Sequence, residues 1–384
     1  MQPRVIIFVG NFFFSIFTAL TIYILLPFLS SFMSEAYTGL VVAVGGLIAV
    51  VTFPFLPRLV ARYGAQELAL VFAIAEMIAL FALAVAPGAI ASALLVIVAV
   101  AIQPFISYEL DLLLEAATTE RDTVGRVRTI FLTAWNFGAL AAPLLLGALL
   151  DDSNEYNRIF LAAAAMLVPF IVLFAARALP EGITPKISHM KDTLVCISHD
   201  RDLSAVTFAH FLLYLFYIWA PLYVPIYLHE VLGIAWASLG WMFSVMLVPY
   251  ALLEYPAGWV ADQVLGDKEM LFAGFIIAGG ALASLSFLSP TSSLTLILCI
   301  LVASRIGAAL IESMTEGHFF RRVSADDINS MSIFRGIWPL ANIIGPIAAS
   351  LILFFGDFQM LFALTGMFLV VAGAGATFLI KDFR

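Results

Sequence analysis

Twelve apolar runs dominate the chain and limit what it can fold into. A helix of about 20 residues crosses roughly 30 Å of hydrocarbon at about 1.5 Å per residue, and each run is long enough to do so. Hydrophobic residues make up 63% of the 384 positions and charged residues only 11%. A soluble globule is about half apolar and about a quarter charged. The chain is therefore predicted to be an all-α polytopic membrane protein, with helices over approximately 5 to 32, 38 to 58, 66 to 86, 89 to 115, 123 to 150, 158 to 178, 203 to 229, 236 to 261, 269 to 289, 292 to 317, 326 to 355 and 358 to 380.

One polar segment, 179 to 202, divides these runs into six and six. It predicts an N-terminal six-helix bundle over 1 to 178, a linker, and a C-terminal six-helix bundle over 203 to 384. The two cysteines, Cys196 and Cys299, come with no close group of metal-ligand residue types. We therefore expect no disulfide framework, no metal site and no cofactor.

The lysines and arginines predict the orientation. With the N-terminus in the cytoplasm, fifteen of them fall on the cytoplasmic side and only Arg158 falls outside. Positive charge accumulates on the cytoplasmic side of membrane proteins, so both termini and the linker are predicted to be cytoplasmic. The first run is too long for a signal-peptide core and is expected to be a retained span. Short loops favour a bacterial inner, or plasma, membrane.

The two halves carry matching polar stripes. The first span has its stripe at Asn11, Ser15 and Thr18, and an offset of 199 leads to His210, Tyr214 and Tyr217 in the seventh. A second offset, 203, relates Trp135 to Trp338 and Glu109 to Glu312. A polar stripe on an apolar helix faces protein or water rather than lipid. The stripes therefore predict the inner walls of two pseudo-symmetric bundles.

The tenth span carries a line of charge at Arg305, Glu312 and Glu316, spaced i, i+7 and i+11. An ionised arginine near mid-membrane costs about 2.5 to 3.5 kcal/mol on insertion scales, so a functional role is expected. The alternative is an internal ion pair that only fixes helix packing. Because a buried carboxyl group changes its proton affinity with its surroundings, the candidate proton-coupling residues are Glu312, Glu316, Glu254 and Asp111.

Further polar and aromatic side chains join these stripes around a predicted central cavity. Such a lining suits an organic solute of drug or metabolite size better than an inorganic ion. Two arginines against several glutamates leave the charge of the substrate open. The candidate substrate-binding residues are Asn11, Ser15, Thr18, Gln103, Trp135, Asn136, His210, Tyr214, Tyr217, Arg305, Arg335, Trp338 and Asn342.

A polar loop motif occurs once in each half. One copy, Gly258, Asp262, Gly266 and Lys268, begins in the last turn of the eighth span and continues after it, and a weaker copy runs from Pro57 to Gly64. This motif resembles the G-x-x-x-D-R/K-x-G-R/K-R/K loop of the major facilitator superfamily. Together with the two sets of six spans, it makes the chain similar to that family over essentially its full length. The sequence departs from the family's loop by one inserted residue in the second copy and by Pro57 and Ala61 in the first. The fifth span also resembles that family's antiporter motif, imperfectly, at Gly138, Ala142, Pro143 and Gly147.

The loop motif also suggests a cytoplasmic gate. An aspartate can accept hydrogen bonds from the free N–H groups at another helix's N-terminus, where the helix dipole is positive. Asp262 is predicted to hold the start of the fifth span in this way. In the other half the charges are predicted to be reversed, with arginines (Arg58 and Arg62) in the loop and aspartates (Asp326 and Asp327) at the start of the eleventh span. The alternative is a set of solvated loop charges. The candidate gate residues are Gly258, Asp262, Arg58, Arg62, Glu109, Arg126, Arg128, Asp326 and Asp327.

The resemblance implies a secondary active transporter that moves a small organic or amphiphilic solute by alternating access, coupled to protons, with efflux favoured. Uptake of an organic anion or metabolite is the alternative within transport, and a transporter-like sensor or scaffold is the alternative outside it. No P-loop or hydrolase motif is present, so neither an ATP-driven pump nor an enzyme is expected. The expected partners are the lipid bilayer, a small-molecule substrate and protons, without nucleic acid, and the chain is expected to be a monomer.

Overall fold

The chain folds into long helices joined by short connections. The computed structural model describes residues 2–85, 88–118, 124–150, 154–180, 199–263, 266–323 and 328–381, and within these ranges it contains no strand. The α-helices are α1 (Pro3–Ser30), α2 (Glu35–Thr52), α3 (Leu56–Tyr63), α4 (Ala65–Ala84), α5 (Ala89–Ala116), α6 (Val124–Leu150), α7 (Tyr156–Ala175), α9 (Arg201–Ile226), α10 (Trp236–Gln263), α11 (Asp267–Ser284), α12 (Leu294–Arg322), α13 (Ile328–Phe355) and α14 (Phe358–Leu379).

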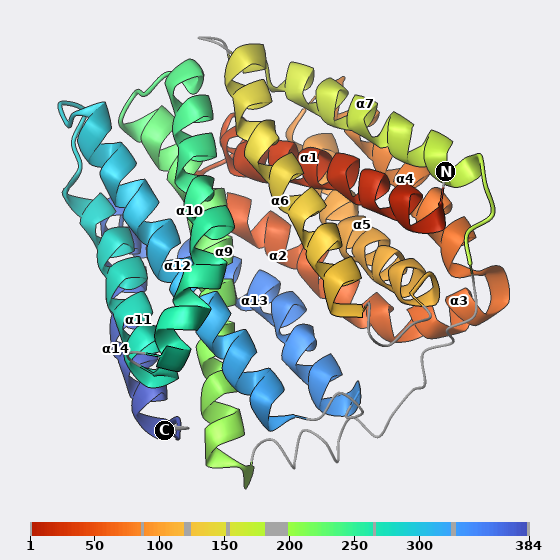
Figure 1. Ribbon diagram of the computed structural model, residues 1–384. Coiled ribbons are helices and arrows are strands. Elements are labelled where there is room, and N and C mark those ends of the chain that lie inside the picture. Colours follow the sequence, from red (N-terminus) through yellow and green to blue (C-terminus); the bar gives the residue numbers. More distant parts are fainter. Residues whose placement is uncertain are drawn as a thin grey trace. The chain divides into compact units, whose positions relative to one another are not determined.

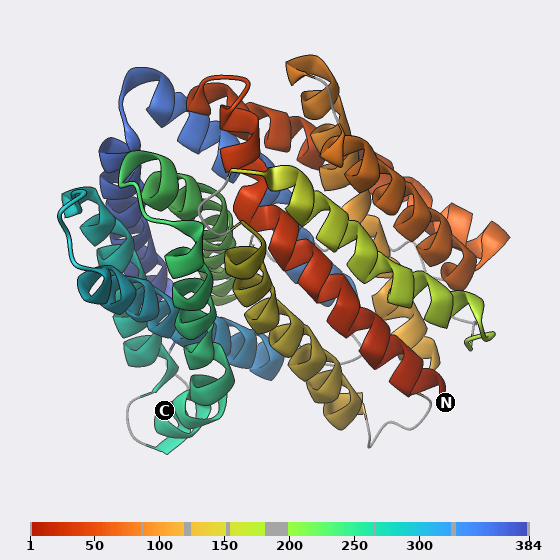
Figure 2. The same ribbon diagram turned by 90° about the horizontal axis from the view of Figure 1, so that it is seen from above.

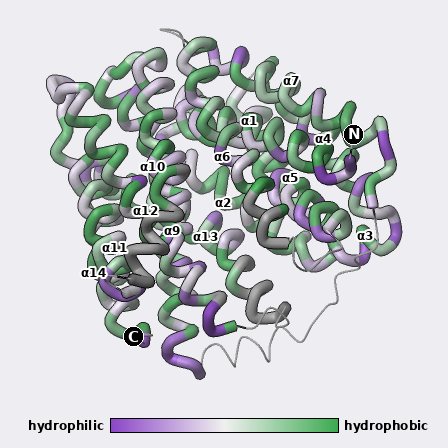
Figure 3. The backbone as a smooth tube through the Cα atoms, in the orientation of Figure 1, coloured by the Kyte–Doolittle hydropathy of each residue, from purple (hydrophilic) through white to green (hydrophobic). Residues whose placement is uncertain are grey.

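Eleven spans formed by these helices are long and apolar enough to cross a membrane, counted over the described residues. The second of them joins α2 and α3 through the 3₁₀ turn η1 (Phe53–Phe55). The long helix outside this count is α10. Figure 3 shows mostly hydrophobic colouring along the helices, with hydrophilic stretches toward helix ends such as α3. The predicted all-α polytopic fold is confirmed, and the predicted spans match the helices to within a few residues.

The chain divides into two compact units. Unit 1 contains Met1–Lys186, Leu228–Glu230 and Ile234–Ser244, and unit 2 contains Ile187–Tyr227, Val231–Gly233 and Val245–Arg384. The chain passes between them at the C-terminal end of α9, where the π-helical turn η3 (Tyr227–Val231) follows the helix. Unit 1 thus holds α1 to α7 with the first turns of α10.

In unit 1, α1 packs along both α6 and α7, and Figures 1 and 2 show these three helices side by side. Helix α4 packs on α5 and α7, and α2 packs on α5. Aromatic rings fill the contact of α1 with α7: Phe14 lies 6.3 Å from Phe170, and Phe28 lies 4.8 Å from Phe160, measured between ring centroids. Close packing of this kind holds membrane helices together, because lipid tails provide no hydrophobic drive between them.

In unit 2, α11 packs against α12 and α14, and α9 packs against α12, α13 and α14. Glycines bring the backbones of α11 and α14 into contact. A Cβ placed on Gly279 would lie 2.7 Å from the carbonyl oxygen of Gly366, so no larger residue fits there without a shift. Small residues allow such close approach of membrane helices.

Two hydrogen bonds fix α9 against the proline-containing part of α13. Trp219 Nε1 donates to the Gly345 carbonyl at 2.9 Å, and the Tyr223 hydroxyl donates to the Pro346 carbonyl at 3.4 Å. A carbonyl oxygen has two lone pairs, so each of these carbonyls can accept a side-chain hydrogen bond in addition to its helical one. These bonds set the rotation of α9 and direct its polar stripe toward α12 and α13.

Candidate functional site

The polar stripe of α9 lies against α12 and α13. His210 Nδ1 is 3.0 Å from Thr315 Oγ1 on α12, and the His210 ring stacks on Phe334 of α13 with 4.0 Å between centroids. One turn further along, Tyr214 meets Trp338 edge to face at 5.2 Å. Three predicted binding residues, His210, Tyr214 and Trp338, therefore lie together in one aromatic wall.

Tyr217 ends this stripe with a strong hydrogen bond. Its hydroxyl donates to Glu312 Oε2 on α12 at 2.5 Å, a distance typical of an O–H group bonded to a carboxylate. The Tyr217 ring also lies 6.2 Å from the ring of Tyr250 on α10. Tyr250 in turn interacts electrostatically with both Arg305 and Glu312. A phenol, a carboxylate and a guanidinium group thus share one region of unit 2.

Arg305 is the buried charge of this site. Only 4% of the residue is exposed, and its guanidinium carbon lies 5.1 Å from the centre of the Phe216 ring on α9. A guanidinium group at this distance from an aromatic face gains a cation–π interaction. Its Nε is buried without a hydrogen-bond partner. Within the described ranges no carboxylate forms a salt bridge with Arg305.

The three charged residues in line on α12 therefore differ in their burial. Arg305 is buried, Glu312 is half-buried and bonded to Tyr217, and Glu316 is exposed. On α13, the Asn342 side chain bonds within its own helix, since its Nδ2 donates to the Trp338 carbonyl one turn earlier at 3.2 Å. The side chains of Glu254 and Arg335 lie outside the described residues.

The matching stripe in unit 1 binds backbone rather than side chains. Asn11 Nδ2 donates to the Phe131 carbonyl at 2.8 Å, and Ser15 Oγ donates to the Trp135 carbonyl at 2.7 Å, both on α6. Thr18 Oγ1 is buried without a hydrogen-bond partner. Asn11 and Ser15 thus tie α1 to α6 instead of lining open space. Of the remaining candidates in this unit, Gln103, Trp135 and Asn136 are half-buried.

The contacts of the two stripes repeat with the offsets found in the sequence. Asn11 meets residue 131 and Ser15 meets residue 135; correspondingly, His210 meets Phe334 and Tyr214 meets Trp338. The charge does not repeat, because the residue 203 positions before Arg305 is Ile102. The buried arginine site belongs to unit 2 alone.

The predicted gate residues are placed only in part. Arg58 and Arg62 are exposed, and Arg62 lies over the Tyr63 ring at 5.1 Å. Glu109 is fully buried and Asp111 is half-buried, both on α5. The gate remains a prediction. The other gate candidates have side chains or positions outside the described residues, namely Gly258, Asp262, Arg126, Arg128, Asp326 and Asp327.

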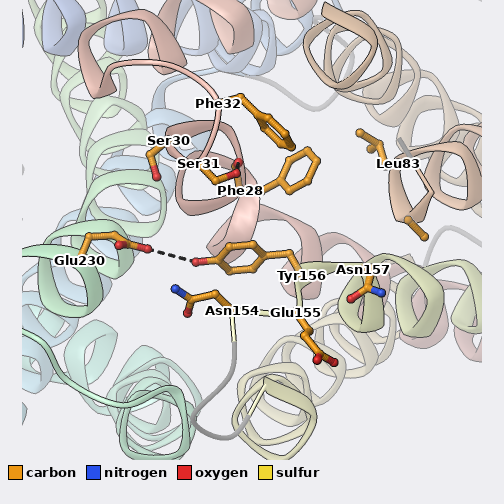
Figure 4. Close-up of a pocket in the computed structure, with 11 residues that line it drawn as sticks. Phe28, Ser30, Ser31, Phe32, Leu83, Asn154, Glu155, Tyr156, Asn157 and Glu230 are labelled. Atoms are coloured by element: carbon orange, nitrogen blue, oxygen red, sulfur yellow. Dashed lines mark hydrogen bonds between the residues drawn. The ribbon is translucent and has the colours of Figure 1, made fainter. Parts of the chain in front are cut away.

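Unit 1 also contains a polar pocket of about 350 Å³. Figure 4 shows Tyr156 and Glu230 facing each other in it, and the Tyr156 hydroxyl donates to Glu230 Oε1 at 3.2 Å. Neighbouring His229 Nε2 lies 2.7 Å from Asn154 Oδ1. No predicted substrate-binding residue lines this pocket. It is lined by Phe28, Ser30, Ser31, Phe32, Leu83, Ala84, Asn154, Glu155, Tyr156, Asn157 and Glu230.

Three residues of the arginine site were not predicted: Phe216, Tyr250 and Thr315. Phe216 is adjacent in sequence to the predicted Tyr217, but nothing in the apolar seventh span distinguishes its ring from the other aromatics. Tyr250 lies one helical turn before Glu254, a spacing that could have drawn attention to it. Thr315 directly precedes the exposed Glu316 and carries no separate signal.

Solved transporter structures share this arrangement of helices. A bacterial homologue of the human lysosomal transporter Spinster is 13% identical, with 98% of this chain and 95% of that one covered at a TM-score of 0.77. The nucleoside transporter NupG is 14% identical, with 99% of each chain covered at 0.78. A POT family transporter, solved with a thioalcohol-conjugated peptide, is 12% identical, with 96% and 94% covered at 0.76.

Residues 206–382 also match the family model described as Major Facilitator Superfamily. The chain has the major facilitator fold. The matched family consists of transporters rather than enzymes, which agrees with the predicted class of the chain. No curated protein matches the chain by sequence. The major facilitator fold accounts for the two sets of helices, while the substrate must be inferred from the residues of the site.

Proposed function

We propose that this chain is a secondary transporter that works by alternating access and carries a small organic solute with an anionic group. The observation that carries the proposal is Arg305. It is buried in unit 2, lies over an aromatic ring and has an Nε without a hydrogen-bond partner among the described residues. Burying a charge is costly unless it is paired, and no described carboxylate forms a salt bridge with Arg305, so the site favours a ligand that brings the opposite charge.

The geometry of Arg305 favours a carboxylate or similar planar anion. Its Nε and one Nη form an edge that can donate two parallel hydrogen bonds to such a group, and such bonds are roughly twice as strong as neutral ones. Phe216 and Tyr250 lie beside it, and Tyr217 lies next to Tyr250; these aromatic rings suit the organic part of a solute. The names of similar structures support an organic substrate, since one is a nucleoside transporter and another was solved with a peptide conjugate.

We propose Glu312 as the proton-coupling residue and efflux as the direction. Tyr217 donates to one oxygen of Glu312, which stabilises the ionised form. Glu312 follows Arg305 by two helical turns on the same face of α12, about 10 Å along the axis. An anion bound at Arg305 neutralises the positive charge that favours the ionised form of Glu312, so anion binding promotes protonation of that carboxyl group and couples the two events. The imperfect antiporter motif of the fifth span supports efflux as the direction.

Ligand binding is the first test. Purified protein is screened by thermal shift against organic anions, amphiphilic cations, sugars and amino acids, because a ligand at about 100 times its Kd stabilises the folded state by about 2.7 kcal/mol. We expect the stabilising compounds to be organic anions. Arg305→Gln should weaken their binding by roughly 10- to 150-fold, the equivalent of losing a charged hydrogen bond worth about 1.5 to 3 kcal/mol.

The control is Ser304→Ala, since the Ser304 hydroxyl bonds only to the Leu301 carbonyl of its own helix. It should leave binding unchanged. Stabilisation by cations that survives Arg305→Gln would refute the proposed substrate class.

Flux in proteoliposomes tests transport itself. The compound found above should exchange across the membrane, and a pH gradient should drive it in the wild type but not in Glu312→Gln. Glutamine keeps the shape and an acceptor for Tyr217 while removing the titrating group. Specific binding without flux would favour a sensor over a transporter, and gradient-driven flux in Glu312→Gln would move the proton site elsewhere.

A further inference from the structure

The polar pocket of unit 1 shares no residue with the arginine site of unit 2. It has a volume of about 350 Å³ and forms where four segments distant in the sequence meet. These are the C-terminal end of α1 with the residues after it, the end of α4, the start of α7 with the residues before it, and the turn η3. All of its lining residues belong to unit 1. Its size suits a small organic molecule.

Glu230 is the carboxylate that faces into the pocket. Figure 4 shows it opposite Tyr156, whose hydroxyl donates to Glu230 Oε1 at 3.2 Å. Tyr156 is itself held by two edge-to-face ring contacts, with Phe28 at 6.3 Å and with Trp236 at 6.2 Å between centroids. The Glu230 side chain is 34% exposed, so a ligand can reach it. Tyr156 therefore fixes the carboxylate in place and leaves it accessible.

The basic side chains of this region are bound elsewhere. Within the described ranges no lysine or arginine forms a salt bridge with Glu230. The second carboxylate of the pocket, Glu155, pairs with Arg158 one turn later, and Figure 4 shows it directed away from Glu230. Arg158 and Glu155 therefore balance each other, and Glu230 keeps its charge for a ligand.

His229 precedes Glu230 on η3 but does not complete its set of partners. His229 Nε2 lies 3.9 Å from Glu230 Oε1, which is too far for a hydrogen bond. Both ring nitrogens are engaged elsewhere, Nδ1 at 2.9 Å from the Ile234 carbonyl and Nε2 at 2.7 Å from Asn154 Oδ1. These contacts hold the imidazole ring beside the carboxylate rather than on it.

The hydroxyl groups at the pocket offer acceptors rather than donors. At the end of α1, Ser30 donates to the Pro27 carbonyl at 2.7 Å and Ser31 donates to the Phe28 carbonyl at 2.6 Å. A hydroxyl oxygen that has donated its hydrogen still has lone pairs, and a carboxylate only accepts. Both serines and Glu230 can therefore receive hydrogen bonds from a ligand that donates them.

Aromatic rings form the apolar side of the pocket. Phe28 and Phe32 meet edge to face with 5.3 Å between centroids, and Phe32 is 39% exposed. Figure 4 shows both rings on the same side of Tyr156. The face of an aromatic ring attracts a cation, and a nearby carboxylate adds the opposite charge. An anion would instead meet the charge of Glu230, with only the exposed amides of Asn154 and Asn157 to donate to it.

We propose that this pocket binds a small organic ammonium ion. Its N–H groups donate to Glu230, and its hydrocarbon part lies against Phe28 and Phe32. A primary ammonium group has three donors and no acceptor, which matches the acceptors of the pocket. Glu230 also lies on a π-helical turn, a rare geometry that recurs at functional sites. By the positive-inside prediction this end of unit 1 faces the outside, so the ion would bind from there.

Saturation-transfer NMR tests the site, using the full chain in nanodiscs of zwitterionic lipid with butylammonium as the probe. Butan-1-ol is the matched neutral compound, and empty nanodiscs give the signal due to lipid alone. We expect saturable binding of butylammonium and binding of butan-1-ol that is at least about tenfold weaker. Equal affinity for the two compounds, or no saturable binding of butylammonium, would overturn the proposal.

Glu230→Gln should weaken butylammonium binding by roughly 10- to 150-fold, because it removes the charge of the hydrogen-bond acceptor. The matched control is Glu155→Gln, which changes the paired carboxylate of the same pocket and should leave the affinity unchanged. His229→Gln should also leave it unchanged, since the ring makes no hydrogen bond to Glu230. Wild-type affinity in Glu230→Gln would refute the site.

Phe32→Leu keeps the test decisive if Glu230→Gln does not fold. It replaces an exposed ring and should weaken butylammonium binding by about 2- to 5-fold, the loss of a cation–π interaction at an exposed position. An unchanged affinity in this variant would contradict the proposed place of the ammonium ion. Arg305→Gln separates the inference from the proposed transport function, because it should abolish anion binding in unit 2 and leave butylammonium binding intact. Loss of butylammonium binding in Arg305→Gln would place the ion in unit 2 and overturn the pocket.

Discussion

Two adjacent glycines of α11 allow the helix packing of unit 2 to be tested with an internal control. A Cβ on Gly279 would lie 2.7 Å from the Gly366 carbonyl oxygen and 2.7 Å from Val370 Cγ2, both on α14, whereas a Cβ on Gly280 would meet nothing within 4 Å. Gly279→Ala therefore forces α11 and α14 apart. Gly280→Ala makes the same chemical change into open space.

The expected magnitudes follow from two opposing effects. Alanine is favoured over glycine inside a helix by about 0.8 to 1.0 kcal/mol, and this gain applies to both variants. Inserting a methyl group into a packed contact typically costs about 1 to 3 kcal/mol. Gly280→Ala should therefore leave the free energy of unfolding unchanged or raise it by up to about 1 kcal/mol. Gly279→Ala should be less stable than Gly280→Ala by about 1 to 3 kcal/mol.

The measurement is the unfolding of both variants in the same lipid–detergent mixture, followed by intrinsic tryptophan fluorescence. The difference between the two variants cancels the helix-propensity gain and leaves the packing cost. Equal midpoints for Gly279→Ala and Gly280→Ala would refute the close approach of α11 and α14. Lower stability of Gly280→Ala would show that its open side is in fact packed.

Three further predictions concern single contacts. Asn11→Leu removes the hydrogen bond from α1 to the Phe131 carbonyl. It should lower the free energy of unfolding by about 0.6 kcal/mol, the average for such bonds in a membrane, with an upper limit near 1.7 kcal/mol. An increase in the free energy of unfolding would contradict this hydrogen bond. Asp200→Ala removes the N-cap of α9, whose side chain accepts from the Leu203 and Asp202 N–H groups, and should cost about 0.5 to 2 kcal/mol in thermal unfolding. The hydrogen bond from the Leu203 N–H is the main cause that lowers the pKa of Asp200, so the stabilisation by the Asp200 carboxylate is present at neutral pH and is lost as the pH falls through the carboxyl range. Asp200→Asn should keep the cap at pH 7 but lose less stability than the wild type on acidification. Identical acid profiles of the two proteins would rule this out.

The helices were predictable because their physical cause is local. An apolar run of about 20 residues must satisfy its own backbone groups in lipid, which leaves the helix as the solution. Offsets of 199 and 203 residues also matched the polar stripes of the two halves. In the structure the contacts of these stripes repeat with the same offsets, since residue 11 meets residue 131 and residue 210 meets residue 334.

The partners of these stripes were not predictable. Asn11 and Ser15 were expected to line a cavity, but each reaches a carbonyl oxygen, and every residue of α6 has such an oxygen whatever its side chain. The guanidinium of Arg305 lies over the ring of Phe216, which is one phenylalanine among 34 in the chain and carries no signal of its own. His318 of α12 lies 3.2 Å from Asp202 of α9 and 3.3 Å from Asp267 of α11, and only the packing of these helices brings the three distant segments together.

The matched contacts of α1 and α9 give the two units different freedom to change. In unit 1, Asn11 and Ser15 bond to main-chain oxygens of α6, so the side chains at 131 and 135 can be exchanged without losing those bonds. In unit 2, the equivalent contacts are made by the rings of Phe334 and Trp338, and every substitution there alters the wall beside the arginine site. Unit 1 can therefore drift in sequence while keeping its shape, and selection for a new solute would act first on unit 2.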